Sequence, residues 1–248
     1  MKNNQSNSKV AIITGSSRGI GAAIAKRLAA DGFTVIVNYA GRSADADRVV
    51  AEIETAGGRA SAVQADVSSA EDVAKLFDRT ETLFGGVDVL VNNAGIMQTM
   101  PLADTDDALF DRTLAVNLKG TFNTLRAAAK RLRPGGRIIN FSTSAIGLAL
   151  PGYALYCATK SAVETMTNIF AKELRGKNIT VNAVAPGPTA TELFLIGKSE
   201  QQIAHLAQMP PLERLGEPDD IARVVSFLAG PDAGWINAQT LRVNGGIV

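Results

Sequence analysis

Tyr156 and Lys160 are the two side chains of this sequence whose types and spacing best suit acid–base chemistry. Residues four positions apart share a face of a helix, so the phenol would lie beside the ammonium group. A free phenol has a pKa of roughly 10, and a neighbouring cation favours its ionised form. The pair could therefore exchange a proton with a substrate oxygen near neutral pH. The spacing alone is weak evidence, because many amphipathic helices contain it.

Three consecutive hydroxyl residues, Ser142, Thr143 and Ser144, precede this pair and follow the apolar run Arg137–Phe141. A hydroxyl at the carboxyl end of a buried strand can hydrogen-bond the carbonyl oxygen of a substrate. Capping of the following helix is the alternative role for such residues. The residues alone do not decide which of the three hydroxyls would be used.

A glycine-rich turn near the start of the chain suits a phosphate group. Gly15, Gly19 and Gly21 lie between the apolar run Val10–Ile13 and a helical pattern. Glycine lets the backbone approach a ligand closely, and a helix N-terminus offers free N–H groups to a pyrophosphate. The spacing differs from G-x-G-x-x-G, and a tight turn without a ligand is the alternative. Its position after the first predicted strand favours a dinucleotide.

The end of the second predicted strand indicates which dinucleotide is used. An acidic residue there would bind the ribose 2′-hydroxyl, whereas an arginine would bind a 2′-phosphate. Here Asn38, Tyr39 and Ala40 provide no carboxylate, and Arg18 and Arg42 are both candidates for the phosphate. The sequence therefore predicts NADP(H) as cofactor. The alternative is that both arginines are ordinary solvated surface residues.

The elements that must position these residues alternate between short apolar runs and longer amphipathic segments. The runs predicted as strands are Val10–Ile13, Thr34–Val37, Ala60–Val63, Val87–Val91, Arg137–Phe141, Ile179–Val184 and Thr240–Val243. The helical segments are Ile20–Leu28, Ala44–Ala56, Ala70–Phe84, Thr105–Leu132, Tyr153–Leu174 and Pro218–Leu228. Runs with little polar alternation are typical of strands buried on both faces. The order predicts an α/β fold, a Rossmann-like doubly wound parallel sheet of about seven strands with helices on both faces.

No linker or internal repeat divides the sequence, so residues 1–248 are predicted to form a single dinucleotide-binding and catalytic domain. Residues 1–8 are expected to form a loose N-terminus. Residues 189–211 interrupt the alternation after the strand Ile179–Val184 and are interpreted as a substrate-loop insertion, because ligands bind beyond the carboxyl ends of such strands. His205 in this insertion is expected at the surface. Met97, Leu148 and Phe194 are candidate apolar walls of a substrate pocket.

Composition excludes or disfavours several other classes of protein. The net charge of +1 gives no basic excess, which disfavours a nucleic-acid or anionic-membrane binder. No apolar run approaches the ~20 residues of a membrane helix, and the polar segment Met1–Lys9 is unlike a signal peptide. Cys157 and His205 are the only residues of their types, which excludes an internal disulfide and disfavours a metal site. We therefore expect a cytoplasmic protein without a metal, acting on a small molecule.

Taken together, these motifs resemble those of the short-chain dehydrogenase/reductase family over nearly the whole chain. Thr14–Gly21 is similar to the family's cofactor turn and Asn92–Gly95 to its N-N-A-G motif. Tyr156 and Lys160 are similar to its catalytic pair. Further matches are Asp66 for the adenine-contacting acid, Asn117 for the structural-catalytic asparagine, Pro186 and Gly187 for the start of a loop, and Thr191 for the carboxamide-binding threonine.

The resemblance implies reversible hydride transfer between a nicotinamide and a carbonyl or secondary alcohol, with Tyr156 as general acid and base. It implies that Lys160 supports the phenolate and contacts the nicotinamide ribose, while Asn117 orders a water. The family's catalytic hydroxyl lies about thirteen residues before the tyrosine, which ranks Thr143 first, then Ser142 and Ser144, although the family usually has serine. The alternative role for Asn117 is that of a polar residue bonded to backbone at a helix bend. Ala238 departs from the family's usual glycine, and we expect it to alter packing or a subunit contact.

By the same resemblance the protein is expected to be an NADP(H)-preferring carbonyl reductase, similar to ketoacyl or hydroxynaphthalene reductases. A homotetramer is expected, packed partly through the helices that carry Asn117 and Tyr156, with a homodimer as the alternative. An NAD(H)-linked alcohol dehydrogenase and a non-catalytic dinucleotide sensor are the competing functions. Residues expected to bind the cofactor are Gly15, Ser17, Arg18, Gly19, Ile20, Gly21, Asn38, Tyr39, Ala40, Arg42, Asp66, Val67, Asn93, Ala94, Gly95, Tyr156, Lys160, Pro186, Gly187, Thr189 and Thr191.

Overall fold

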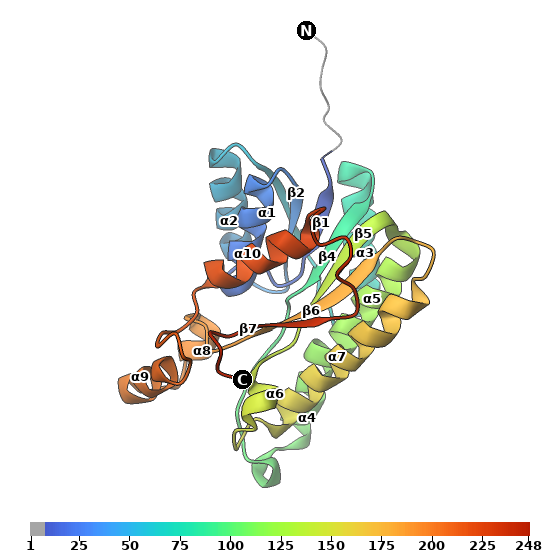
Figure 1. Ribbon diagram of the computed structural model, residues 1–248. Coiled ribbons are helices and arrows are strands. Elements are labelled where there is room, and N and C mark those ends of the chain that lie inside the picture. Colours follow the sequence, from blue (N-terminus) through green and yellow to red (C-terminus); the bar gives the residue numbers. More distant parts are fainter. Residues whose placement is uncertain (1–7) are drawn as a thin grey trace.

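A seven-stranded parallel sheet forms the centre of the computed structural model, which describes residues 8–248 (Figure 1). The strand order is β3-β2-β1-β4-β5-β6-β7. The strands are β1 (Val10–Ile13), β2 (Thr34–Tyr39), β3 (Arg59–Gln64), β4 (Val87–Asn92), β5 (Leu132–Phe141), β6 (Thr180–Pro186) and β7 (Thr240–Val243). The predicted single-domain, Rossmann-like doubly wound fold is confirmed.

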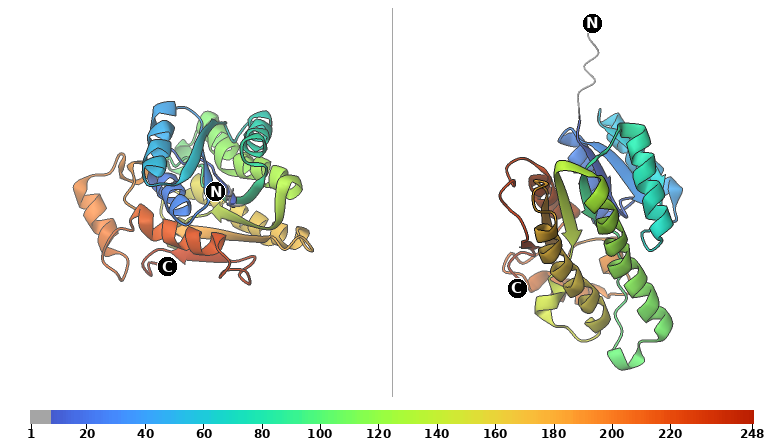
Figure 2. Two further views of the ribbon diagram at one scale, coloured as in Figure 1. Left: turned by 90° about the horizontal axis from the view of Figure 1, so that it is seen from above. Right: turned by 90° about the vertical axis from the view of Figure 1, so that its right-hand side faces the viewer.

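Helices cover both faces of this sheet (Figures 1 and 2). One face packs against α1 (Gly19–Ala30), α2 (Ser43–Thr55) and α10 (Pro218–Ala229). The other packs against α3 (Ala70–Phe84), α5 (Gly120–Arg131) and α7 (Ala154–Glu173). Side chains of a strand point alternately to the two faces, so Ile12 and Ile36 join one core whereas Ile13 and Val37 join the other. This two-sided burial explains the uninterrupted apolar runs of the sequence.

The predicted helical pattern Thr105–Leu132 is divided into several elements. A short turn η1 (Leu102–Asp104) precedes α4 (Asp107–Thr113), and a π-helical turn η2 (Leu114–Lys119) joins α4 to α5. The strand β5 begins at Leu132 and not at Arg137 as predicted, because Leu132 already pairs with Val87 of β4. An irregular stretch around Gly135 (φ 81°) separates this pair from the regular pairing that resumes at Arg137. The π turn carries Asn117, and such turns are frequent at functional sites.

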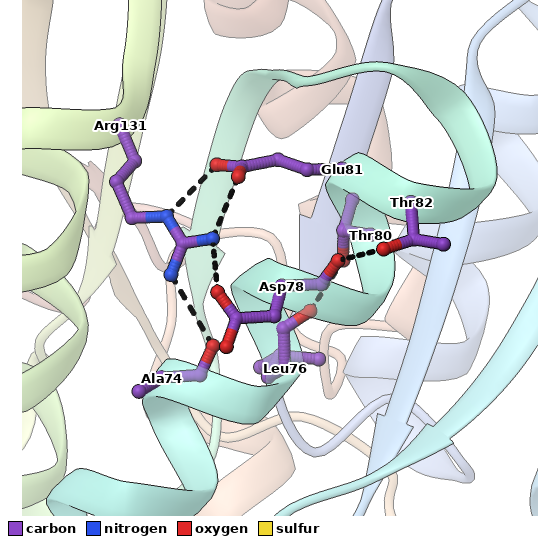
Figure 3. A network of polar contacts seen from close by, with 7 residues as sticks. All are labelled: Ala74, Leu76, Asp78, Thr80, Glu81, Thr82 and Arg131. Carbon is purple, nitrogen blue, oxygen red and sulfur yellow. Dashed lines mark hydrogen bonds and ion pairs between the residues drawn. The ribbon is translucent and has the colours of Figure 1, made fainter.

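Arg131 at the end of α5 ties this helix to α3 (Figure 3). Its Nε and Nη2 donate to the two carboxylate oxygens of Glu81 over 2.8 and 2.7 Å. Nη2 also donates to Asp78 over 2.6 Å, and the guanidinium lies 5.4 Å from the centre of the Phe77 ring. The contact fixes α3 and α5 side by side over the sheet.

A chain of buried polar side chains crosses the sheet below the predicted active site. Thr124 of α5 donates to Asn92 of β4 over 2.7 Å, Asn92 donates to Asn140 of β5 over 2.8 Å, and Asn140 donates to Thr167 of α7 over 2.8 Å. All four side chains are buried. The chain of bonds therefore joins α5 to α7 through two neighbouring strands.

The segment after β6 leaves the sheet and returns to it. It contains α8 (Glu192–Leu195) and α9 (Glu200–Gln208) and closes at a bridge between Thr189 and Gly216. The excursion thus extends beyond the predicted range 189–211. Figure 1 shows α8 and α9 at the same end of the molecule as α4 and α6 (Ala145–Leu148). The predicted substrate loop therefore lies at the end of the sheet where its parallel strands terminate.

Two further expectations concern single residues. Residues 1–7 of the predicted loose N-terminus lie outside the described residues, whereas Ser8 hydrogen-bonds Thr34 through its hydroxyl over 2.8 Å. Ala238 has a φ of 58°, the left-handed conformation in which glycine carries no penalty. Ala238 therefore carries backbone strain, and its side chain packs at the edge of the core beneath α3, α5 and α7.

No helix within residues 8–248 is long and apolar enough to cross a membrane. In the same part of the chain, no group of three or more His, Cys, Asp or Glu side chains is arranged to hold a metal ion.

Candidate active site

Strand β5 and helix α7 bring Thr143, Tyr156 and Lys160 together. Lys160 lies one helical turn after Tyr156, and its Nζ is 5.9 Å from the centre of the tyrosine ring. The same Nζ donates a 2.9 Å hydrogen bond to the backbone oxygen of Phe141, the last residue of β5. This bond holds the end of β5, where the hydroxyl residues begin, against α7.

The three hydroxyls after β5 have different partners. Ser142 donates to a carboxylate oxygen of Glu164 over 2.6 Å. Ser144 donates to the backbone oxygen of Ala185 over 2.9 Å. Thr143 is the one that interacts with the Tyr156 hydroxyl. The structure thus places the first-ranked residue, Thr143, beside the tyrosine and engages Ser142 and Ser144 elsewhere.

Burial controls the protonation of the tyrosine and the lysine. Removal from water raises the pKa of Tyr156 to about 12, and the smaller, opposite effect of the hydrogen bond with Thr143 does not reverse this. Burial lowers the pKa of Lys160 to about 8. In this structure desolvation therefore outweighs the cation's predicted stabilisation of the phenolate. At neutral pH the tyrosine is a protonated phenol, which is the form that can donate a proton.

Asn117 holds the strand-end loop beside these residues. Its Oδ1 accepts from the N–H of Ile96 over 2.8 Å and its Nδ2 donates to the oxygen of the same residue over 2.9 Å. A Cβ atom added at Gly95 would lie 3.3 Å from Asn117 Oδ1 and 3.5 Å from Lys160 Nζ. The predicted residues Asn117, Gly95 and Lys160 therefore converge. From its π turn, Asn117 contacts the backbone of Ile96 and also donates to the Thr159 hydroxyl of α7 over 3.3 Å.

The glycine-rich turn has no room for side chains. A Cβ atom at Gly15 would lie 2.9 Å from the Cα of Ala94, and one at Gly21 would lie 2.5 Å from Nδ2 of Asn93. Asn93 itself donates to the oxygens of Thr14 and Gly15, each over 3.0 Å. The turn is thus fastened to the end of β4, with the start of α1 directly behind it.

Asn38 fastens the same turn from the side of β2. Its Oδ1 accepts from the N–H of Gly15 over 3.1 Å, and its Nδ2 donates to the backbone oxygens of Val63 and Ala65 over 3.2 and 3.0 Å. The side chain that we predicted as a cofactor contact is therefore committed to backbone. It shapes the turn while its residue remains at the edge of the adjoining pocket.

A pocket of about 1460 Å³ opens over this turn. Its lining includes most of the predicted cofactor residues: Gly15, Ser17, Arg18, Gly19, Ile20, Gly21, Asn38, Tyr39, Ala40, Arg42, Asp66, Val67, Asn93, Ala94, Gly95 and Thr191. The Arg42 side chain is 73% exposed there, and Arg18 lies 3.4 Å from Glu192 of α8. Tight glycines, a helix N-terminus and two arginines are the features that a phosphorylated dinucleotide requires, so the residues fit this cofactor.

A second pocket of about 930 Å³ adjoins the first and contains the tyrosine and the lysine. Pro186, Gly187 and Thr189 line this pocket together with Tyr156, Lys160 and Thr143. All three predicted walls, Met97, Leu148 and Phe194, line it as well. His205 is exposed on α9 and is not among its lining residues.

Several lining residues were not predicted from the sequence. Leu193 of α8 and Leu206 of α9 contribute to the wall, and no local pattern separates them from surface leucines. Tyr153 also lines the pocket, and its position three residues before Tyr156 on the same helix was a usable signal. Cys157 is half-buried beside these tyrosines.

Fold and site together define a dinucleotide-dependent oxidoreductase, and comparisons with known proteins identify its family. A family model described as enoyl-(acyl carrier protein) reductase matches residues 15–248. A "short-chain type dehydrogenase/reductase" of Picea abies is 46% identical, covering 97% of this chain and 92% of that protein. An Arabidopsis thaliana protein named "NADPH-dependent aldehyde reductase-like protein, chloroplastic" is also 46% identical, with 97% and 94% coverage.

A solved short-chain dehydrogenase from Burkholderia cenocepacia, in complex with NADP, is 39% identical with a TM-score of 0.91 and covers 99% of both chains. The chain belongs to the short-chain dehydrogenase/reductase family, whose resemblance the sequence motifs had indicated.

Proposed function

We propose that the protein is an NADP(H)-dependent carbonyl reductase that interconverts a carbonyl compound and the corresponding alcohol. The observation that carries this proposal is the convergence of Thr143, Tyr156 and Lys160 in an apolar pocket that opens onto the glycine-rich turn. The names of the Arabidopsis relative and of the NADP complex from Burkholderia support the choice of cofactor.

The nicotinamide cofactor, when bound, supplies the hydride. Tyr156 donates its phenolic proton to the substrate oxygen during reduction and takes a proton back during oxidation. Thr143 donates a hydrogen bond to the same oxygen, which stabilises the negative charge that develops there. Lys160 remains largely protonated below its pKa of about 8 and favours proton release from the tyrosine. Asn117 holds Ile96 in place and orders the water that connects Lys160 to solvent.

Substitutions at the two hydroxyls test this assignment. Tyr156→Phe removes the proton donor, so we expect kcat for NADPH-dependent carbonyl reduction to fall by roughly 10²- to 10⁴-fold. Thr143→Ser keeps a hydroxyl and should retain most activity, whereas the isosteric Thr143→Val should lose it. The measurement is NADPH oxidation with a panel of aldehydes and ketones, with NADPH affinity measured in parallel. NADPH binding without turnover of any carbonyl would instead identify a dinucleotide sensor.

Arg18 and Arg42 are proposed to bind the 2′-phosphate that distinguishes NADPH from NADH. Arg42→Ala should weaken NADPH binding about tenfold, the loss of one charge-assisted hydrogen bond, and leave NADH binding unchanged. Arg48→Ala is the matched control, because Arg48 also pairs with Asp45 but does not line the pocket. If neither Arg42→Ala nor Arg18→Ala lowers NADPH affinity, the assignment of these arginines to the 2′-phosphate is wrong. A wild type that prefers NADH would instead identify an NAD(H)-linked alcohol dehydrogenase.

We further propose a homotetramer located in the cytoplasm. Exposed apolar side chains on the outer helices support the assembly, among them Phe110 of α4, Phe122 of α5 and Ile169 of α7, and Trp235 is 99% exposed. Sedimentation equilibrium distinguishes the tetramer from the alternative homodimer.

The proposed cytoplasmic location is supported by the single cysteine, which leaves no internal disulfide and suits a reducing compartment. Cell fractionation tests this location.

A further inference from the structure

The apolar pocket has a nearly uncharged lining. Among the residues of the described chain that line it, Lys160 is the only one with a formal charge. Its walls are formed by apolar side chains such as Ile96, Leu150 and Leu193. A carboxylate or phosphate placed against these walls would lose its hydration without a partner, which is costly. The pocket therefore favours an uncharged, mainly apolar ligand.

Most polar side chains of this pocket are committed to protein partners. Ser142 donates to Glu164. Thr189 donates to the backbone oxygen of Gly187 over 2.9 Å. Asn93 donates to the glycine turn, and Thr191 accepts from the N–H of Phe194 over 3.3 Å. These groups hold the walls in place and have little capacity left for a ligand.

Apart from Thr143 and Tyr156, which are assigned to the reacting oxygen, Tyr153 is the exception. It immediately precedes α7, so its ring lies one turn before Tyr156 on the same side of the helix. Within residues 8–248 its hydroxyl has no hydrogen-bond partner, and because Tyr153 is only partly buried this oxygen is accessible to a ligand in the pocket. Partial burial also raises the pKa of Tyr153, so the hydroxyl is a neutral donor at physiological pH. A second phenol thus faces the pocket beside the reactive one.

We infer that Tyr153 determines specificity by hydrogen-bonding a second oxygen of the substrate, which is an uncharged, mainly apolar carbonyl compound. This inference rests on the proposed reductase function. The Thr143 and Tyr156 hydroxyls bind the reacting oxygen, and the Tyr153 hydroxyl binds a hydroxyl, ether or second carbonyl group. Because hydrogen-bonding groups hold the substrate at two positions in an otherwise apolar pocket, the substrate binds in one orientation relative to the cofactor.

Reduction of four kinds of probe by the NADPH-loaded enzyme tests the inference. The probes are butanal, 2-tetralone, a series of 2-tetralones with one ring hydroxyl at successive positions, and acetoacetate. We expect 2-tetralone to exceed acetoacetate in kcat/KM by at least tenfold. We expect at least one hydroxylated isomer to exceed 2-tetralone, because it gains the bond to Tyr153.

The variant Tyr153→Phe removes only the phenolic oxygen. For the favoured isomer, the ratio of its kcat/KM to that of 2-tetralone should fall roughly 3- to 10-fold, the effect of one neutral hydrogen bond. Thr165→Ala, at an exposed position of α7, is the matched control and should leave the ratio at its wild-type value. Turnover of butanal by both variants shows that they are folded.

The possible failures are distinguishable. If 2-tetralone or butanal is reduced but every isomer keeps its ratio in Tyr153→Phe, the role of Tyr153 is wrong and the reductase function stands. If acetoacetate is reduced as efficiently as 2-tetralone, the apolar substrate class is wrong. If no carbonyl is reduced although NADPH binds, the proposed function itself fails and the inference fails with it.

Discussion

At the scale of single residues, Lys160 shows that the active site is assembled against the stability of the fold. Only 4% of its surface is exposed, and its Nζ donates to Phe141. Burial lowers its pKa to about 8 from an ordinary value of 10.5. The charged form is therefore less favourable in the folded protein than in the unfolded chain. Functional sites commonly carry such a cost.

Replacing this lysine by a neutral residue of similar length is expected to stabilise the protein without ligands. Below pH 8 the folded wild type holds a buried charge, so Lys160→Met should raise the free energy of unfolding at pH 7 by about 1–3 kcal/mol. Between pH 8 and 10.5 the unfolded wild type binds more protons than the folded one, so wild-type stability gains and the difference shrinks. Urea denaturation at pH 7 and pH 9.5 measures both values.

Lys172→Met is the control for this experiment, because Lys172 is exposed on the same helix. It should change the free energy of unfolding by less than about 0.5 kcal/mol at either pH. A Lys160→Met protein that is less stable than the wild type at pH 7, or a difference that is the same at both pH values, would contradict the argument.

The sequence predicted much of this site, and its failures have a physical basis. Helical spacing placed Tyr156 beside Lys160, and the count along the chain placed Thr143 first among three hydroxyls. The spacing of Tyr156 and Lys160 does not show how far the tyrosine is removed from water. It therefore predicted a lowered tyrosine pKa, whereas burial raises that pKa in this structure. It also could not show that the Asn38 side chain turns toward backbone, because that depends on strands brought together only by folding.

At the scale of elements, the packing of α3 against α5 depends on one side chain. Arg131 binds both oxygens of Glu81 and one of Asp78 (Figure 3). Its guanidinium also covers the ring of Phe77. Two-pronged arginine–carboxylate contacts are stronger than ordinary surface ion pairs. The half-exposed carboxylates moderate the gain, because solvent screens them.

Arg131→Met should therefore lower the free energy of unfolding by about 1–2 kcal/mol. The loss should be smaller in 1 M NaCl, which screens the wild-type pairs. Arg79→Met on α3 is the matched control, since Arg79 is exposed and forms no ion pair within residues 8–248. Equal denaturation midpoints for the two variants would show that the network contributes nothing.

Some ends of helices and strands could be predicted from the local sequence, whereas others depend on tertiary contacts. The predicted helix Ala70–Phe84 matches α3, because Ser69 caps its start and Gly85 adopts φ 79° at its end. The division of the segment after Thr105 was missed, because the π turn around Asn117 forms through contacts with Ile96. Likewise, the pairing of Leu132 with Val87 that extends β5 is a tertiary contact without a local signal.

At the scale of the whole molecule, the two pockets share a wall. Ile20, Asn93, Gly95, Ile96 and Leu193 line both. A ligand in one pocket therefore contacts residues that shape the other, and occupation of the larger pocket completes the surface of the smaller. Coupling between two binding sites is reciprocal, so each ligand must change the affinity of the other by the same factor.

We expect this coupling to be positive. The dissociation constant of NADP⁺, measured by calorimetry, should fall about fivefold or more in the presence of saturating 2-naphthol, an uncharged bicyclic compound without a reducible carbonyl. The affinity for 2-naphthol should rise by the same factor when NADP⁺ is saturating. If 2-naphthol does not change the dissociation constant of NADP⁺, the two pockets are not energetically coupled through the shared wall.

The buried chain from Thr124 to Thr167 has a consequence for how the molecule avoids misfolding. The facing segments of β4 and β5 are almost uniformly apolar, so packing alone distinguishes poorly between neighbouring alignments of the two strands. In the native alignment Asn92 lies opposite Asn140, and their side chains satisfy each other. A slip by one residue would break this bond and leave the Nδ2 donor of Asn92 and the Oδ1 acceptor of Asn140 buried without a partner, at a cost of roughly 1–3 kcal/mol each. The asparagine pair therefore destabilises slipped alignments of β4 and β5 relative to the native alignment. Without it, apolar packing alone would make the slipped and native alignments almost equally stable.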